Sequence, residues 1–277
     1  MTYKNIAVWL DAKRDAPTEV GMQLALDFGA HLVGLNHFHV PRLPPYVQTY
    51  VGEDIARARI ERASEEARAA SAAFSENAVR RGVTGAEART LGGDPISGLA
   101  THARYADLVV MGQPDPQAAL DPADLEFPDH AILACGRPVL MVPYTGTFKT
   151  IGSHAVVAWS ATREATRAVT DALPLLKRAK KVTVITGDAS PSPDGHGASP
   201  GADIALYLAR HGVEVTVSRE AAAGLDIGAL LLSRIADLDA DLLVMGAYGH
   251  SRLRELVMGG VTRTILKSMT VPVLMSH

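Results

Sequence analysis

The chain has 277 residues, 47% hydrophobic and 21% charged, a balance that supplies enough apolar side chains for two folded domains. The formal net charge of -3 at pH 7 excludes generic binding to nucleic acid or acidic lipid, because such binding needs a basic surplus. The single cysteine, Cys135, excludes an internal disulfide and a zinc site built from several cysteines.

Short apolar runs alternate with helical patterns through the first half. Gly82 is expected to end the long amphipathic helix, because glycine tolerates the left-handed conformation of a C-cap. Residues 39–51 contain three prolines and predict a loop. In chain order, the pattern predicts a strand at 6–10, a helix at 18–30, a strand at 32–38, a helix at 55–81, a strand at 87–91, a helix at 96–104, and strands at 108–111 and 139–142.

The second half follows the same order. Residues 188–201 are rich in Gly, Pro and Ser and predict a second loop. Nearly all-apolar strands that alternate with helices are typical of a parallel sheet covered on both faces. The predicted strands lie at 155–159, 182–186, 214–218, 242–245 and 271–275, and a helix is predicted at 261–268.

Two segments of the first half recur in the second half. The sequence ADLVVMG at 106–112 matches ADLLVMG at 240–246, and PVLM at 138–141 recurs at 272–275, both at an offset of 134 residues. Two matches in one register indicate an internal duplication. We therefore predict two tandem, doubly wound, Rossmann-like α/β domains with parallel sheets, at 1–149 and 150–277.

The beginning of the chain carries only five apolar residues in a row before Asp11, fewer than a secretory signal needs. No apolar run approaches the length of a membrane span. We therefore expect a soluble, cytoplasmic protein.

A glycine pattern follows the fourth strand of the second half: Gly246 and Gly249, nine further residues, then Gly259 and Gly260 before a helix. In open α/β sheets, ligands bind beyond the carboxyl ends of the strands, where glycine lets the backbone approach them closely. A helix start presents free N–H groups that suit phosphate. The alternative is that these glycines only end a strand and a helix. Nearby donors are Thr262, His250, Arg252 and Arg254.

These residues resemble the universal stress protein family, whose nucleotide-binding members carry Gly-x2-Gly-x9-Gly-[Ser/Thr] after the fourth strand. Gly246, Gly249 and Gly259 match that spacing, Val261 matches as well, and the resemblance extends over both halves. It implies an adenine nucleotide alpha hydrolase-like fold that binds ATP or a related adenine nucleotide, with Mg²⁺ as an optional companion. The implied contacts are Ala158, Ser160, Met245, Gly246, Tyr248, Gly249, His250, Arg252, Gly259, Gly260, Val261 and Thr262.

Two positions of the second half depart from the family pattern. Gly260 stands where the family has Ser or Thr, so one hydroxyl that faces phosphate is missing while the backbone N–H remains. Ser160 stands at the family's acidic position after the first strand, and a hydroxyl is a weaker acceptor than a carboxylate.

The first half keeps the acidic position as Asp11 but lacks the glycines. At the offset of 134, Asp115, Leu125 and Glu126 replace Gly249, Gly259 and Gly260, and prolines at 114 and 116 remove backbone donors. Carboxylates repel a triphosphate, so we expect a degenerate nucleotide site in this half.

Other constellations have plainer interpretations, and neither a catalytic set nor a metal site is expected. His37-x-His39 lacks an evident third ligand, and Asp237-x-Asp239-x-Asp241 is typical of a polar turn before a strand. Cys135 lies in a polar segment before a strand and is expected to be passive.

Three functions remain open on the sequence. The first is a non-enzymatic stress-response protein that binds an adenine nucleotide in its second half; the second adds slow ATP hydrolysis or autophosphorylation. The third is an interaction scaffold with no nucleotide. The apolar strands at 139–142 and 271–275 indicate assembly. Since such strands pair at domain interfaces in the family, the resemblance implies that the halves pair as an intrachain pseudo-dimer, and further homodimerisation is left open.

Overall fold

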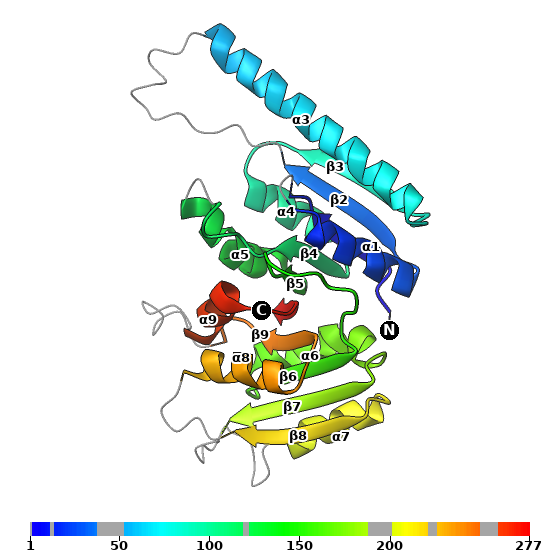
Figure 1. Cartoon of the computed structure of the whole chain (residues 1–277), viewed down its shortest axis with the longest axis vertical. Helices are drawn as coiled ribbons and strands as arrows, with labels where there is room; N and C mark the ends of the chain where they lie inside the picture. The colour runs from blue at the N-terminus through cyan, green and yellow to red at the C-terminus, as the bar shows by residue number, and fades with distance from the viewer. Residues whose placement is uncertain are drawn as a thin grey trace.

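Strands and helices alternate in the computed structural model, which describes residues 2–11, 14–37, 53–118, 122–187, 201–220, 226–249 and 260–277 (Figure 1). The elements of the first half are β1 (Asn5–Trp9), α1 (Ala16–Phe28), β2 (His31–His37), α3 (Glu53–Arg80), β3 (Ala86–Leu91), α4 (Pro95–Ala103), β4 (Leu108–Gly112), α5 (Pro122–Cys135) and β5 (Val139–Val142). Those of the second half are β6 (His154–Trp159), α6 (Arg163–Leu176), β7 (Lys181–Gly187), α7 (Ala202–Arg210), β8 (Val215–Glu220), α8 (Ile227–Asp237), β9 (Leu242–Gly246), α9 (Gly260–Ser268) and β10 (Val273–Ser276).

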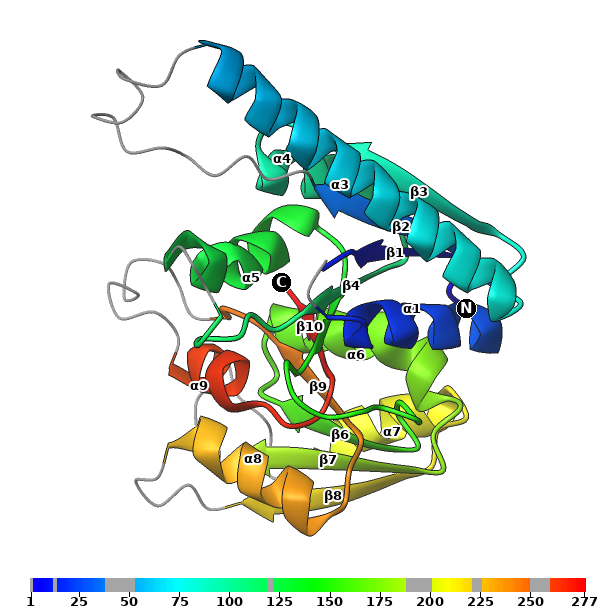
Figure 2. The same cartoon turned by 45° about the horizontal axis from the view of Figure 1, so that its top comes forward.

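One ten-stranded sheet runs through the molecule in the order β3-β2-β1-β4-β5-β10-β9-β6-β7-β8 (Figures 1 and 2). Within each half neighbouring strands are parallel, and both halves have the same strand order when counted from their own first strand. The halves meet where β5 pairs antiparallel with β10, with Leu140 opposite Leu274. The predicted doubly wound α/β class is confirmed.

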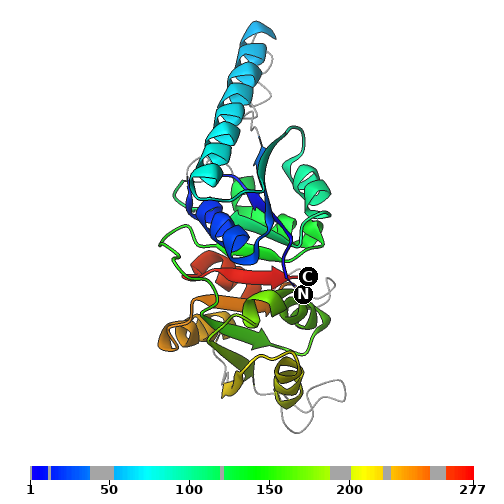
Figure 3. The same ribbon diagram turned by 90° about the vertical axis from the view of Figure 1, so that its right-hand side faces the viewer.

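Each face of the sheet carries its own hydrophobic core. Buried residues of α1, α3, α6 and α7 pack on one face, and those of α4, α5, α8 and α9 pack on the other. Both cores contain side chains from both halves, so each core continues across the β5–β10 seam. Figure 3 shows helices on both sides of the sheet. This three-layer arrangement explains why the strands read as continuous apolar runs instead of alternating ones.

Caps in the sequence set several helix boundaries. Gly82 has φ of 81° just after α3 ends at Arg80, which confirms its predicted left-handed role. The carboxylates of Asp94 and Asp226 accept hydrogen bonds from the first backbone N–H groups of α4 and α8. These acids stand at the same place in the two halves.

The segment before β5 was predicted wrongly. It is not a polar stretch but α5, which contains Pro128 within the helix. Buried Ala131, Ile132 and Cys135 form a stripe that packs against the sheet, and this burial outweighs the prolines and acids that obscured the helical pattern.

Strand boundaries differ from the predicted ones by one or two residues. The largest shifts are at β8, which runs to Glu220, and at β10, which begins at Val273 after Pro272 instead of at 271. Proline lacks the N–H that a ladder requires, so Pro272 contributes only its carbonyl, which accepts a hydrogen bond from the Leu243 N–H, and the strand begins after it. The predicted loops at 39–51 and 188–201 lie outside the described residues, except Gly201. The domain boundary at 149 and 150, which falls between β5 and β6, stays a prediction. No helix within the described ranges is long and apolar enough to cross a membrane.

Replacing Leu274 by alanine tests the seam. Leu274 is fully buried opposite Leu140, so the cavity left behind is expected to lower the free energy of unfolding by about 2–5 kcal/mol. Leu206, half exposed on α7, is the matched control, and its alanine variant is expected to stay within about 0.5 kcal/mol. Urea unfolding followed by circular dichroism measures the free energy of unfolding of both variants. Equal losses of stability in the Leu274 and Leu206 variants would contradict the role of the seam.

Candidate functional site

The candidate site lies where β6 and β9, the central strands of the second half, end beside the N-terminus of α6. Ala158 and Met245 are direct partners in the parallel β6–β9 ladder, so the structure brings these two predicted residues together. Ser160 follows β6 directly, and Gly246 is the last residue of β9. The parallel register thus gathers segments 85 residues apart at one end of the sheet, the position where α/β proteins bind ligands.

Hydroxyl groups order the turn between β6 and α6. Thr162 is the N-cap of α6, and its Oγ1 accepts a hydrogen bond from the Ala165 backbone N–H at 3.2 Å. The Ser160 and Thr162 hydroxyls lie 3.2 Å apart. Ala161 between them has φ of 54°, a conformation that non-glycine residues rarely adopt. Backbone strain is therefore present next to the candidate site.

Gly246 and Gly249 let the turn after β9 pack tightly on α6. A Cβ on Gly246 would lie 2.5 Å from the Ala165 backbone nitrogen. A Cβ on Gly249 would lie 2.9 Å from Oε2 of Glu164. Because the contact at Gly246 is with backbone atoms, that position requires glycine for close approach, whereas a Cβ on Gly249 would require the Glu164 side chain to move.

Glu164 is a buried acid in this site that the sequence analysis missed. Its residue is 3% exposed, and its carboxylate lies between Thr162 and Gly249 and accepts a hydrogen bond from the exposed Arg163 guanidinium. Burial acts to raise the pKa of Glu164, but hydrogen bonds from Arg163, the Glu164 backbone and Thr162 together lower that pKa below its usual range. The carboxylate is therefore ionised at neutral pH. The sequence signal for this residue is an acid in the first turn of a helix that follows an N-cap threonine, where acids are favoured.

Tyr248 connects the site to the first half of the chain. It has φ of 56°, and its hydroxyl donates a hydrogen bond to the Asp129 carboxylate on α5. Its ring lies near the His277 ring. Thr262, 4% exposed on α9, accepts a hydrogen bond from the Tyr248 backbone N–H at 3.5 Å. Thr262 thus contacts this turn from within the core, and its predicted role toward a phosphate stays a prediction.

The remaining predicted residues divide into two groups. Gly260 begins α9, and a Cβ there would meet no atom of the described residues within 4 Å. Val261, next to it, is half-buried against the core. His250, Arg252 and Gly259 lie outside the described residues. Their roles stay predictions.

The first half closes the corresponding place with an ion pair. Arg14 contacts the Asp11 carboxylate at 2.6 Å and also donates a hydrogen bond to the Gln113 carbonyl beyond β4. The Arg14 guanidinium lies 4.0 Å from where a Cβ on Gly112 would project. Asp115, the counterpart of Gly249, accepts a hydrogen bond from the Gln117 backbone N–H.

The acidic and histidine motifs make contacts within the protein. Asp241 accepts hydrogen bonds from the backbone N–H groups of Ser153 and His154, and Asp237 pairs with Arg234. The His37 ring lies 3.0 Å from the Gly93 carbonyl oxygen, while His39 lies outside the described residues. In the part of the chain that is described, no group of three or more His, Cys, Asp or Glu side chains is arranged to hold a metal ion.

Residues 153–277, which contain the whole candidate site, match the model of the Universal stress protein family. The chain is 56% identical over 34 residues to Universal stress protein Slr1230 of Synechocystis, a match that spans 12% of each protein. The crystal structure of a universal stress protein from Archaeoglobus fulgidus has a TM-score of 0.73 and 16% identity, and the match covers 98% of this chain and 95% of that one. This likeness shows the fold of both halves. A universal stress protein solved in complex with cAMP matches 51% of this chain and 98% of its own, at 20% identity and a TM-score of 0.37, too low to carry a ligand over.

Thiol chemistry tests the passive role of Cys135. Burial raises the pKa of the Cys135 thiol to about 12, so almost no thiolate forms at pH 8. Alkylation of the native protein by iodoacetamide at pH 8 is expected to be at least about a hundredfold slower than alkylation in urea. Mass spectrometry of timed samples measures both rates. Comparable rates would mean that Cys135 is accessible and reactive.

Proposed function

We propose that this chain, whose residues 153–277 belong to the Universal stress protein family, binds ATP or a related adenine nucleotide in its second half and acts by binding instead of by turnover. The observation that carries the proposal is the convergence of the Gly246–Gly249 turn with the N-terminus of α6 at the carboxyl ends of β6 and β9. The proposal includes a cytoplasmic location, and it leaves homodimerisation to measurement.

The geometry suggests a place for each part of the nucleotide. The base would lie near Ala158 and Met245, which are ladder partners. Ser160 would bind the ribose as a hydroxyl donor or acceptor. The phosphates would meet the backbone of Gly249 and the α9 N-terminus at Gly260, where the helix dipole favours negative charge.

The first half is proposed to be a structural partner without a nucleotide. Its acidic position, Asp11, is already paired with Arg14, and Arg14 also reaches the Gln113 carbonyl. A nucleotide would have to break both contacts before it reached the strand ends.

An interaction scaffold is the competing function, and Glu164 favours it. A buried, ionised carboxylate next to Gly249 repels phosphate, and the chain lacks the family's hydroxyl at Gly260. Mg²⁺ carried by the nucleotide would supply the opposing charge, and the oxygens of Glu164, Thr162 and Ser160 are ligands that this ion accepts.

The first experiment separates these functions. Mass spectrometry of small molecules released from freshly purified, denatured protein is expected to detect an adenine nucleotide, with close to one per chain. Calorimetric titration with ATP, with and without Mg²⁺, then gives the affinity. No released nucleotide and no heat at millimolar ATP would leave the scaffold as the function.

Gly260→Ser restores the family's hydroxyl at the first residue of α9. Because no described residue has an atom within 4 Å of a Cβ there, the substitution is expected to keep the fold and to tighten ATP binding about fivefold through one hydrogen bond to phosphate. Gly249→Asp, which introduces the residue of the first half, is the opposite control and is expected to abolish binding. Calorimetry measures each variant, and an unchanged affinity in both would place the phosphates elsewhere.

Glu164→Gln removes the buried charge and keeps the shape of the side chain. ATP affinity without Mg²⁺ is expected to rise about tenfold, or ~1.4 kcal/mol, because the repulsion between carboxylate and phosphate is lost. With Mg²⁺ the gain is expected to shrink. Arg163→Ala, which removes the partner of Glu164, is expected to weaken binding instead. Equal affinities of the wild type and Glu164→Gln in both conditions would show that the phosphates do not approach Glu164.

A further inference from the structure

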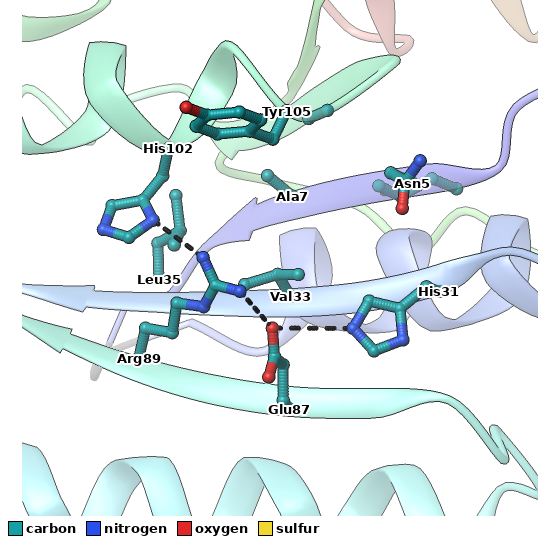
Figure 4. A pocket seen from close by; sticks show the side chains of 11 residues that line it. Asn5, Ala7, His31, Val33, Leu35, Glu87, Arg89, His102 and Tyr105 are labelled. Carbon is teal, nitrogen blue, oxygen red and sulfur yellow. Dashed lines mark hydrogen bonds and ion pairs between the residues drawn. The ribbon is translucent and has the colours of Figure 1, made fainter.

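A cavity of about 130 Å³ opens in the first half, at the amino ends of the central strands (Figure 4). Ala7, Val33 and Leu35 form an apolar floor on β1 and β2. Tyr105, 78% exposed just after α4, lies at the opening. No residue of this cavity belongs to the candidate nucleotide site.

A chain of polar contacts lines one side of the cavity. The Glu87 carboxylate contacts Arg89 at 2.5 Å and His31 at 3.5 Å, and Arg89 reaches Nδ1 of His102 at 3.1 Å (Figure 4). Hydrogen bonding from Arg89 lowers the pKa of Glu87. Burial and the charge of Arg89 lower the pKa of His102, which keeps that ring neutral at pH 7. The opposite charges of Glu87 and Arg89 balance, so the cavity favours a ligand without net charge.

The second half fills the corresponding space with one of its own side chains. Asn5 begins the β1 ladder opposite His31, and His154 begins the β6 ladder opposite Lys181, so His154 is the counterpart of Asn5. The His154 ring lies 2.9 Å from the Leu238 carbonyl oxygen and 3.0 Å from the Thr183 hydroxyl. Leu238 ends α8 as Arg104 ends α4, and Thr183 is the counterpart of Val33 in the strand register. An imidazole therefore occupies in the second half the volume that stays open in the first.

We propose that this cavity is a binding site for a small, uncharged, planar nitrogen heterocycle of imidazole or pyridine size. Its volume is close to that of cavities of about 150 Å³ that bind benzene in other proteins. The apolar floor contacts the faces of the ring, and His31, Glu87 and His102 present hydrogen-bonding groups at its edge. Tyr105 offers an aromatic face at the opening.

Imidazole is the probe, and its titration is followed by ¹⁵N NMR at pH 8, where the probe is mostly neutral. Saturable shifts centred on the amides of Ala7, Val33 and Tyr105 are expected, with a dissociation constant in the millimolar range that suits a ligand of five heavy atoms. The absence of saturable shifts at these amides up to about 50 mM probe would overturn the proposal.

Two variants import the residues of the second half. Asn5→His places an imidazole side chain in the cavity, as His154 does in the second half. Ala7→Val adds two methyl groups to the floor of the cavity, where the second half has Val156. Each is expected to weaken imidazole binding at least about tenfold, and Asn5→His is also expected to raise the melting temperature. Asn5→Gln, an amide at the same exposed position, is the matched control and is expected to bind as the wild type does. Unchanged binding in both Asn5→His and Ala7→Val would overturn the proposal.

Discussion

The antiparallel pairing of β5 with β10 is the contact on which the rest of the molecule depends. Both strands are buried along their length, and residues from both halves fill each of the two cores. Each half alone would expose an apolar strand edge of the kind that proteins rarely leave open. Tyr3 of the first half also donates a hydrogen bond to the Asp171 carbonyl on α6 of the second half. The two halves therefore share one sheet and two cores.

The two halves share one strand order but differ in which end of their strands is left open. In the second half, glycines at 246 and 249 keep the strand ends close to α6 and free of Cβ atoms. In the first half, Arg14 and Asp11 occupy that place with an ion pair. At the amino ends the asymmetry reverses, because His154 fills the second half while Asn5 leaves a cavity in the first. In each half, therefore, side chains fill the space at one end of the strands and leave it open at the other end.

Glu164 shows how packing and ligand binding compete in a small space. Its carboxylate is held by Arg163 and Thr162 beneath the Gly249 turn, so it stabilises the local structure. The same negative charge disfavours phosphate, so the proposed nucleotide site needs a positive charge, such as Mg²⁺ or Arg163, next to Glu164. Tyr248, in the same turn, is bonded to α5 of the first half, so a ligand that moves this turn would act on both halves.

The sequence by itself determined the α/β class, the internal duplication and the glycine turn after β9, because apolar runs, a repeat of fixed offset and glycine spacing can all be seen in the sequence alone. It also predicted that Ala158, Ser160, Met245 and Gly249 lie at one edge, since the carboxyl ends of parallel strands meet at the same edge of a sheet. Helix α5 escaped prediction because its evidence is burial of Ala131 and Ile132 against strands distant in sequence. Only the tertiary structure decided that Glu164 lies beneath Gly249, that Thr262 is buried and that Arg14 closes the first half. Some of these contacts join side chains that lie 50 residues or more apart in the sequence, and others depend on the direction that a side chain takes within a turn. Neither property leaves a periodic pattern in the sequence.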